Sequence, residues 1–119
     1  MSKQVLIALA LLALFTPAFA EETVKQYCDR VIADAEKGPE QALAAGHLYR
    51  SGTWRGQKCA KVDYARAFEF YVKAGALGDA DRLLRDLEYK VNAGMASARI
   101  AIERLEARGY IRVDKIEVR

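Results

Sequence analysis

The chain has 119 residues with 19 Lys or Arg and 16 Asp or Glu, which gives a formal net charge of +3. This near balance of charge does not single out nucleic acid or a membrane surface as a partner. The length suits one domain near the low end of the usual size range.

The first 20 residues predict a secretory signal peptide. Lys3 supplies a positive flank, Val5–Phe15 an almost continuous apolar run, and Ala18-Phe19-Ala20 a small-x-small cleavage site. The alternative is a membrane anchor, but a span needs about 20 apolar residues and this run breaks at Thr16-Pro17. Cleavage after Ala20 removes one lysine and no acid from a net charge of +3, leaving +2. We therefore expect a periplasmic or secreted protein with no stable membrane insertion after cleavage.

Both cysteines, Cys28 and Cys59, lie beyond the predicted cleavage site. In an oxidising compartment an even pair in a small domain most simply forms one disulfide. A metal site would need further ligands, and the chain offers only one histidine, His47, and no C-x-x-C spacing. The cysteines therefore predict a structural disulfide, no metal and no redox motif.

The first predicted helix covers residues 23–38 and begins with a capping box. Thr23 and Gln26 have the required spacing, and the face that carries Cys28 is apolar. Gly38 ends this helix and Pro39 suits the first turn of a second helix, which extends to about residue 50. That second helix carries a stripe of small residues closed by one aromatic ring, formed by Ala42, Ala45, Gly46 and Tyr49.

A loop over residues 52–62 leads to a third predicted helix, 63–76, with Asp63 as its N-cap. Its apolar residues form two overlapping stripes, which is typical of a helix packed between two neighbours. These residues are Tyr64, Ala67, Phe68, Phe70, Tyr71, Ala74 and Leu77.

We expect Gly78 to end the third helix and Asp79 to cap a fourth, residues 79–91. Residues 92–94 form a turn, and a fifth helix covers residues 97–109. The tail, residues 110–119, alternates apolar and other side chains, which indicates a short strand or an extended arm. It docks on the helices, pairs with another chain or is frayed, and the pattern does not choose among these.

Residues 42–78 resemble the Sel-one-like repeat, a relative of the tetratricopeptide repeat. The matched positions are Gly46, Tyr49, Gly52, Asp63, Tyr64, Arg66, Ala67, Tyr71, Lys73, Ala74 and Gly78. The chain departs from the family pattern at Ala74-Gly75, where a second alanine is usual, and in its longer loop. Residues 79–109 keep the helices but few signature residues, and form either a degenerate repeat or a capping helix pair.

The resemblance implies an all-α, right-handed stack of about five helices over residues 21–109, a fragment of a solenoid. Arrays of this kind present a concave surface to other proteins, so the resemblance implies an adaptor, assembly or accessory factor whose partner is another protein.

Catalytic residues are not evident in this sequence. The chain lacks G-x-S-x-G, S-x-x-K and H-E-x-x-H motifs and a glycine-rich phosphate loop. The lone His47 has no sequence partner to orient it. We therefore expect no enzyme and no cofactor, with a small hydrolase-like enzyme of the cysteine-containing repeat family kept as an alternative.

Trp54 and Arg55, in the loop, are candidate partner-binding residues because Trp and Arg are enriched at binding hot spots. Trp54 equally suits packing under the loop beside the disulfide. A secreted inhibitor that inserts this loop into a target is a further alternative.

The segment from residue 102 to residue 118 also looks like a helix running into the wing of a winged-helix DNA-binding domain. Glu103 and Glu106 lie where phosphates would have to approach, and no basic recognition surface is evident. Export argues against this class, so we expect no nucleic-acid partner.

Overall fold

The computed structural model describes residues 22–113 and the backbone of residues 117–118. The predicted signal peptide, residues 1–20, lies outside the described residues. The described part is mostly helical and contains two short antiparallel hairpins. The helices are α2 (Val24–Asp34), α3 (Pro39–Ser51), α4 (Tyr64–Lys73), α5 (Leu77–Asn92) and α6 (Ala96–Ala107); the strands are β1 (Thr53–Trp54), β2 (Gln57–Lys58), β3 (Ile111–Arg112) and β4 (Glu117–Val118).

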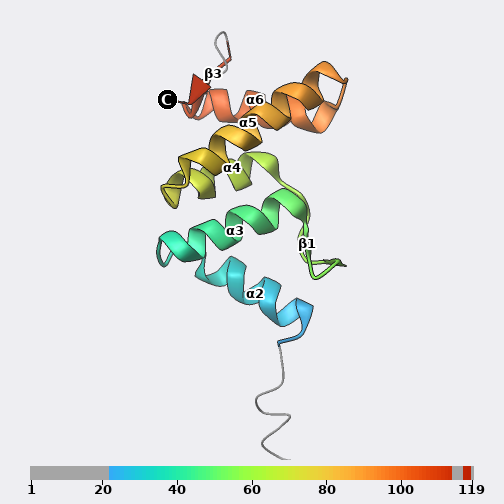
Figure 1. Cartoon of the computed structure of the whole chain (residues 1–119), viewed down its shortest axis with the longest axis vertical. Helices are drawn as coiled ribbons and strands as arrows, with labels where there is room; N and C mark the ends of the chain where they lie inside the picture. Colours follow the sequence, from blue (N-terminus) through green and yellow to red (C-terminus); the bar gives the residue numbers. More distant parts are fainter. Residues whose placement is uncertain (1–21, 114–116, 119) are drawn as a thin grey trace, which may run out of the picture.

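The five described helices lie one above another in chain order (Figure 1). Each helix packs against the next in sequence, and α4 also contacts α6. Helix α4 therefore has neighbours on both sides, in keeping with its two predicted apolar stripes. Whether this arrangement is a repeat stack of the predicted family stays a prediction.

Helix α2 begins with the predicted capping box, which is confirmed. The Thr23 hydroxyl accepts a hydrogen bond from the backbone N–H of Gln26, whose side chain accepts one from the backbone N–H of Thr23. The helix buries only Cys28 and Val31, with Ala35 just beyond its end. Helix α2 thus adds little apolar surface to the core, so its position depends on other links.

Helix α3 begins at Pro39, as predicted, and its small residues allow α4 to approach closely. A Cβ atom added to Gly46 would lie 2.8 Å from Cδ1 and Cε1 of Tyr71. Ala42 and Ala45 are buried on the same helix. The stripe of small residues is therefore where the Tyr71 ring packs against α3.

The loop after α3 folds back on the helix through backbone hydrogen bonds and the disulfide. Gly52, with φ of +72°, caps α3, and its carbonyl accepts hydrogen bonds from the N–H groups of Cys59 and Ala60 at 2.8 and 3.1 Å. Cys28 and Cys59 form the predicted disulfide, with Cα atoms 5.5 Å apart. Disulfides persist in oxidising compartments, so this bond fits a protein outside the cytoplasm.

Helix α4 is capped by Asp63, as predicted, since its carboxylate accepts a hydrogen bond from the Arg66 N–H at 3.0 Å. The end of α4 differs from the prediction. Gly75, with φ of +72°, ends the helix and lets the N–H of Ala76 bond to the carbonyl of Tyr71 at 2.9 Å, a Schellman arrangement that needs a left-handed residue. The predicted terminator Gly78 lies within α5.

Helix α5 begins at Leu77 rather than after an Asp79 cap. Asp79 lies in its first turn, where its carboxylate pairs with Arg82 at 2.7 Å. An acid in the first turn of a helix is favoured by the helix dipole, so Asp79 supports the helix start without capping it.

The described part of the C-terminal tail forms a hairpin instead of a lone strand. Strand β3 pairs antiparallel with β4, with Ile111 opposite Val118 and Arg112 opposite Glu117. Ile111 is fully buried against the helices. Strand β3 therefore forms its backbone hydrogen bonds with β4 inside the tail, and its Ile111 side chain also packs on the helices. The sequence did not predict this combination.

Candidate protein-binding surface

The loop residues singled out in the sequence pack against α2. Strands β1 and β2 form a hairpin in which Arg55 and Gly56 both have positive φ, 51° and 73°, as a type I′ turn requires. The half-buried Trp54 ring stacks on Tyr27, with ring centroids 3.9 Å apart and planes 9° apart. The Arg55 guanidinium lies 4.5 Å from the centre of the Trp54 ring. The structure thus brings Trp54 and Arg55 together, with one face of the indole covered by Tyr27.

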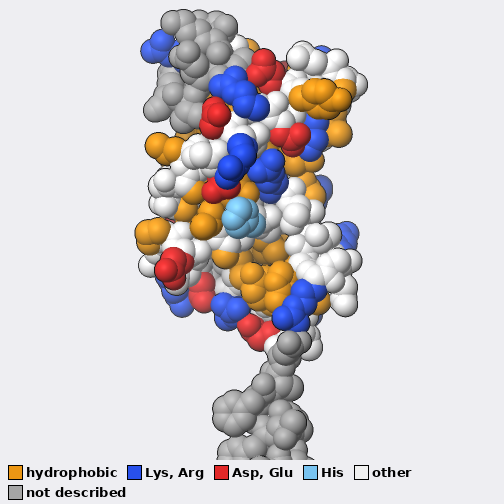
Figure 2. Space-filling view, in the orientation of Figure 1, with side chains coloured by type: hydrophobic (Ala, Val, Ile, Leu, Met, Phe, Trp, Pro, Cys, Tyr) orange, Lys and Arg blue, Asp and Glu red, His pale blue; other side chains and the backbone are white. Residues whose placement is uncertain are grey.

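A small hollow of about 320 Å³ adjoins this stack, lined by Tyr27, Leu43, His47 and Trp54 among others. Figure 2 shows hydrophobic side chains below the imidazole of the chain's single histidine and charged side chains above it.

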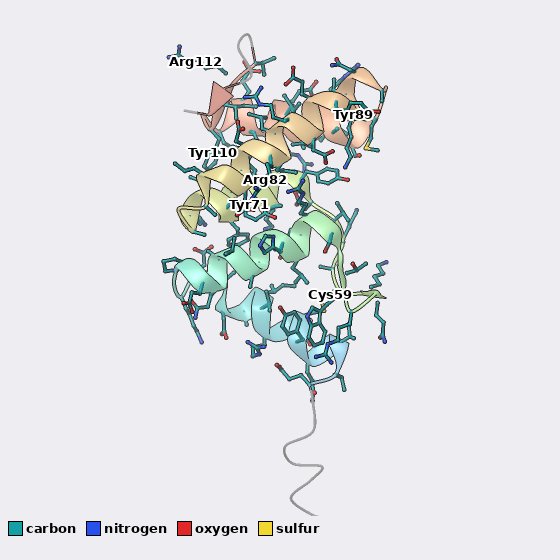
Figure 3. The ribbon with its side chains drawn as sticks, viewed as in Figure 1. Cys59, Tyr71, Arg82, Tyr89, Tyr110 and Arg112 are labelled. Atoms are coloured by element: carbon teal, nitrogen blue, oxygen red, sulfur yellow. A yellow bond between two sulfur atoms is a disulfide. The ribbon has the colours of Figure 1, made fainter. Side chains whose placement is uncertain are left out.

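The hydroxyl of Tyr71 lies 2.8 Å from Nδ1 of His47. Tyr71 is fully buried, whereas His47 is exposed, and burial raises the pKa of Tyr71, an effect that the neighbouring Arg50 guanidinium partly offsets. Tyr71 and Arg82 lie close together in Figure 3, at the level where α3 meets the helices above it. Because a buried hydroxyl needs a hydrogen-bond partner, the contact with His47 explains how the core accepts a tyrosine here.

A larger depression, which we name the α4–α6 groove, has a volume of about 830 Å³. Its walls come from the end of α2, the loop before α4, the first turns of α4 and one face of α6. The lining residues are Ile32, Tyr49, Cys59, Ala60, Lys61, Val62, Asp63, Tyr64, Ala65, Arg66, Met95, Ser97, Ile100, Ala101 and Arg104.

Exposed hydrophobic side chains gather in this groove. Among the described residues seven large hydrophobics are exposed, and four of them line the groove. These are Ile32, Val62, Met95 and Ile100, with exposed fractions of 40%, 41%, 41% and 47%. Single exposed apolar residues are ordinary, but a contiguous group marks an interaction site.

The charges that line the groove are mostly positive. Lys61, Arg66 and Arg104 face a single acid, Asp63, whose carboxylate already caps α4. The Arg66 guanidinium lies 5.2 Å from the centre of the Tyr49 ring, and its Nη1 is 3.5 Å from the Tyr49 hydroxyl. The lining of the groove thus combines exposed apolar side chains with an excess of positive charge.

The sequence did not indicate the α4–α6 groove, and the candidate partner-binding residues Trp54 and Arg55 lie outside it, so that their role in binding stays a prediction. One available signal was Ile100, which lies off the core face of its helix that carries Ala98, Ala101, Ile102 and Leu105. The signature residues Gly46, Tyr49, Ala67 and Tyr71 are buried, so they serve packing, and only Tyr49 among these four reaches the groove.

Comparison of the chain with protein-family models, curated proteins and solved structures found no match. The Sel-one-like resemblance therefore stays a prediction made from the residues. Within residues 22–113 and 117–118, no group of three or more His, Cys, Asp or Glu residues has the arrangement of a metal site. No helix of that same region is both long and apolar enough to span a membrane.

Proposed function

We propose that the protein acts in the periplasm or outside the cell as a Sel-one-like helical protein that binds another protein. The observation that carries the proposal is the gathering of four exposed hydrophobic side chains around the α4–α6 groove. The predicted signal peptide and the disulfide between Cys28 and Cys59 support the location. The protein works by recognition, as an adaptor, assembly or accessory factor.

The groove supports this function better than the loop does. The half-buried Trp54 ring stacks one face on Tyr27, and the Arg55 guanidinium also contacts the ring, so part of the indole surface is already used in packing within the chain. In the groove, by contrast, Ile100 and Met95 are exposed and contribute little to the core. Covering them with a partner would release ordered water from apolar surface, the main driving force of protein association.

Site-specific photo-crosslinking tests the proposal. A photoreactive residue placed at position 100 of the full chain, expressed in its native host, should give discrete crosslinks to a partner protein in the envelope or the medium. Leu77, which is 58% exposed and does not line the groove, is the matched control position and should give none. Equal crosslinking from both positions, or none from position 100, would refute the groove as the binding site.

A further inference from the structure

We infer that the α4–α6 groove takes a protein segment that combines acidic and large apolar side chains. The inference rests on the proposed protein-binding function and adds the chemistry of the partner. Two properties of the groove lead to it: where its hydrophobic side chains lie, and which of its charges are already satisfied.

The floor and walls require apolar side chains from the partner. Ile32 comes from α2, Val62 from the loop, and Met95 and Ile100 from the start and middle of α6. Because these residues stand on three separate segments, one apolar side chain cannot cover them all. The partner must therefore present several large apolar groups along one face.

The cations at the edge require acidic groups. The side chains of Lys61 and Arg104 form no hydrogen bond, ion pair or ring contact with any residue that the structure describes. Outside the groove, Lys90 lies 2.9 Å from Asp86 and Arg108 pairs with Glu69, whereas the exposed side chain of Arg99 has no described partner. The groove thus places two cations without a described side-chain partner, Lys61 and Arg104, beside its exposed apolar side chains.

The two other charged residues of the groove, Asp63 and Arg66, also favour an acidic partner. The Asp63 carboxylate is held by the backbone N–H of Arg66, and the Arg66 guanidinium is fixed against the Tyr49 ring. A guanidinium that is already held in place loses less conformational entropy on forming a bidentate pair with a carboxylate than a mobile guanidinium does. Nucleic acid also carries negative charge, but its phosphates would find an apolar floor here, so the groove favours a protein segment.

Selection from a random peptide display library tests the inference. The bait is the full mature chain with its disulfide intact, and binders that also bind Ile100→Asp are removed, so that the remaining peptides depend on the groove. We expect these peptides to be enriched in Asp and Glu interspersed with Leu, Ile, Phe or Met. Their binding should weaken as salt is raised, because salt screens exposed charges.

Charge reversal then provides a matched comparison. Arg104→Glu should weaken a selected peptide about tenfold or more, because it replaces attraction by repulsion at the edge of the groove. Arg99→Glu, an equal charge change at an exposed position of α6 that does not line the groove, should leave the affinity within about twofold, because exposed charges that are not in direct contact interact only weakly through water and salt. Circular dichroism of each variant confirms that the helices are retained.

The outcomes separate this inference from the function on which it rests. Groove-dependent peptides that are neutral or basic would overturn the acidic partner and leave the protein-binding function standing. A failure to select any groove-dependent peptide would count against both. If sedimentation shows a dimer that Ile100→Asp converts to a monomer, the occupant is a second copy of the chain and the inference is wrong.

Discussion

Replacing Gly46 by alanine tests how closely α3 and α4 are packed. The added Cβ atom would lie 2.8 Å from Cδ1 and Cε1 of Tyr71 and 3.3 Å from the backbone oxygen of Ala67. The Tyr71 ring is fully buried and its hydroxyl is bonded to His47 at 2.8 Å. The ring therefore cannot move aside without disturbing the core and this hydrogen bond.

The size of the effect follows from two opposing contributions. Overpacking a core costs about 1–3 kcal/mol, whereas alanine is favoured over glycine inside a helix by about 1 kcal/mol. We expect Gly46→Ala to lower the free energy of unfolding by about 1 kcal/mol, and at most about 2 kcal/mol. For a domain of this size, each kcal/mol of lost stability lowers Tm by roughly 4–8 °C.

Gly78→Ala is the matched control, because an added Cβ at Gly78 in the first turn of α5 has nothing within 4 Å. Here the helix preference acts alone, and we expect stability to rise by up to about 1 kcal/mol. Urea unfolding of both variants with the disulfide intact, followed by circular dichroism, measures the difference. Equal stabilisation by the two substitutions would contradict this prediction, because it would show that Tyr71 leaves room for a Cβ atom at position 46.

Two further predictions concern the disulfide and the buried tyrosine. Replacing Cys28 and Cys59 together by serine should lower the free energy of unfolding by about 3–4 kcal/mol, because the bond closes a segment with a sequence separation of 31; unchanged urea midpoints would contradict this. Burial raises the pKa of Tyr71 above its ordinary value of 10.0, so the folded state holds this proton more tightly than the unfolded state. The stability that this protonated hydroxyl contributes to the folded state is fully present below the pKa of the unfolded chain. It is lost as the pH rises through the raised pKa of the folded state. Unfolding measured against pH should therefore show a steeper alkaline loss in the wild type than in Tyr71→Phe, and parallel curves would show that burial of Tyr71 has no such effect.

The features that the sequence predicts well are decided within a few residues. The capping box of Thr23 and Gln26, the helix start at Pro39 and the cap at Asp63 all appear as expected. Each depends on one side chain meeting a backbone group less than one turn away, so tertiary contacts have little influence on them.

The end of α4 shows where local reasoning fails. Both Gly75 and Gly78 suit a helix terminus by residue type, and the family pattern favoured Gly78. The choice is made by the backbone, since the carbonyls of Tyr71 and Val72 accept hydrogen bonds from the N–H groups of Ala76 and Gly75. Ending the helix there leaves a short connection, and α5 begins at once.

The groove was beyond prediction because it has no sequence pattern of its own. Periodicity identifies buried residues such as Leu105, and by exclusion leaves Ile100 on the other face of its helix. It does not reveal that Ile32 and Val62 lie along the same depression, because that depends on how α2 and the loop are placed against α6. The hairpin of the tail was missed because the alternation indicates extended backbone without showing that the tail turns back and pairs with itself.

The disulfide has a consequence for how the α4–α6 groove is assembled. Cys28 stands one turn before Ile32, and Cys59 lines the groove close to Val62, so the two segments that the bond joins are also two walls of the groove. Since α2 buries few side chains of its own, the chain before oxidation lacks a firm hold on the first of these walls. If the groove binds a partner as we propose, its assembly is coupled to formation of this disulfide, and we expect a reduced chain to bind less well.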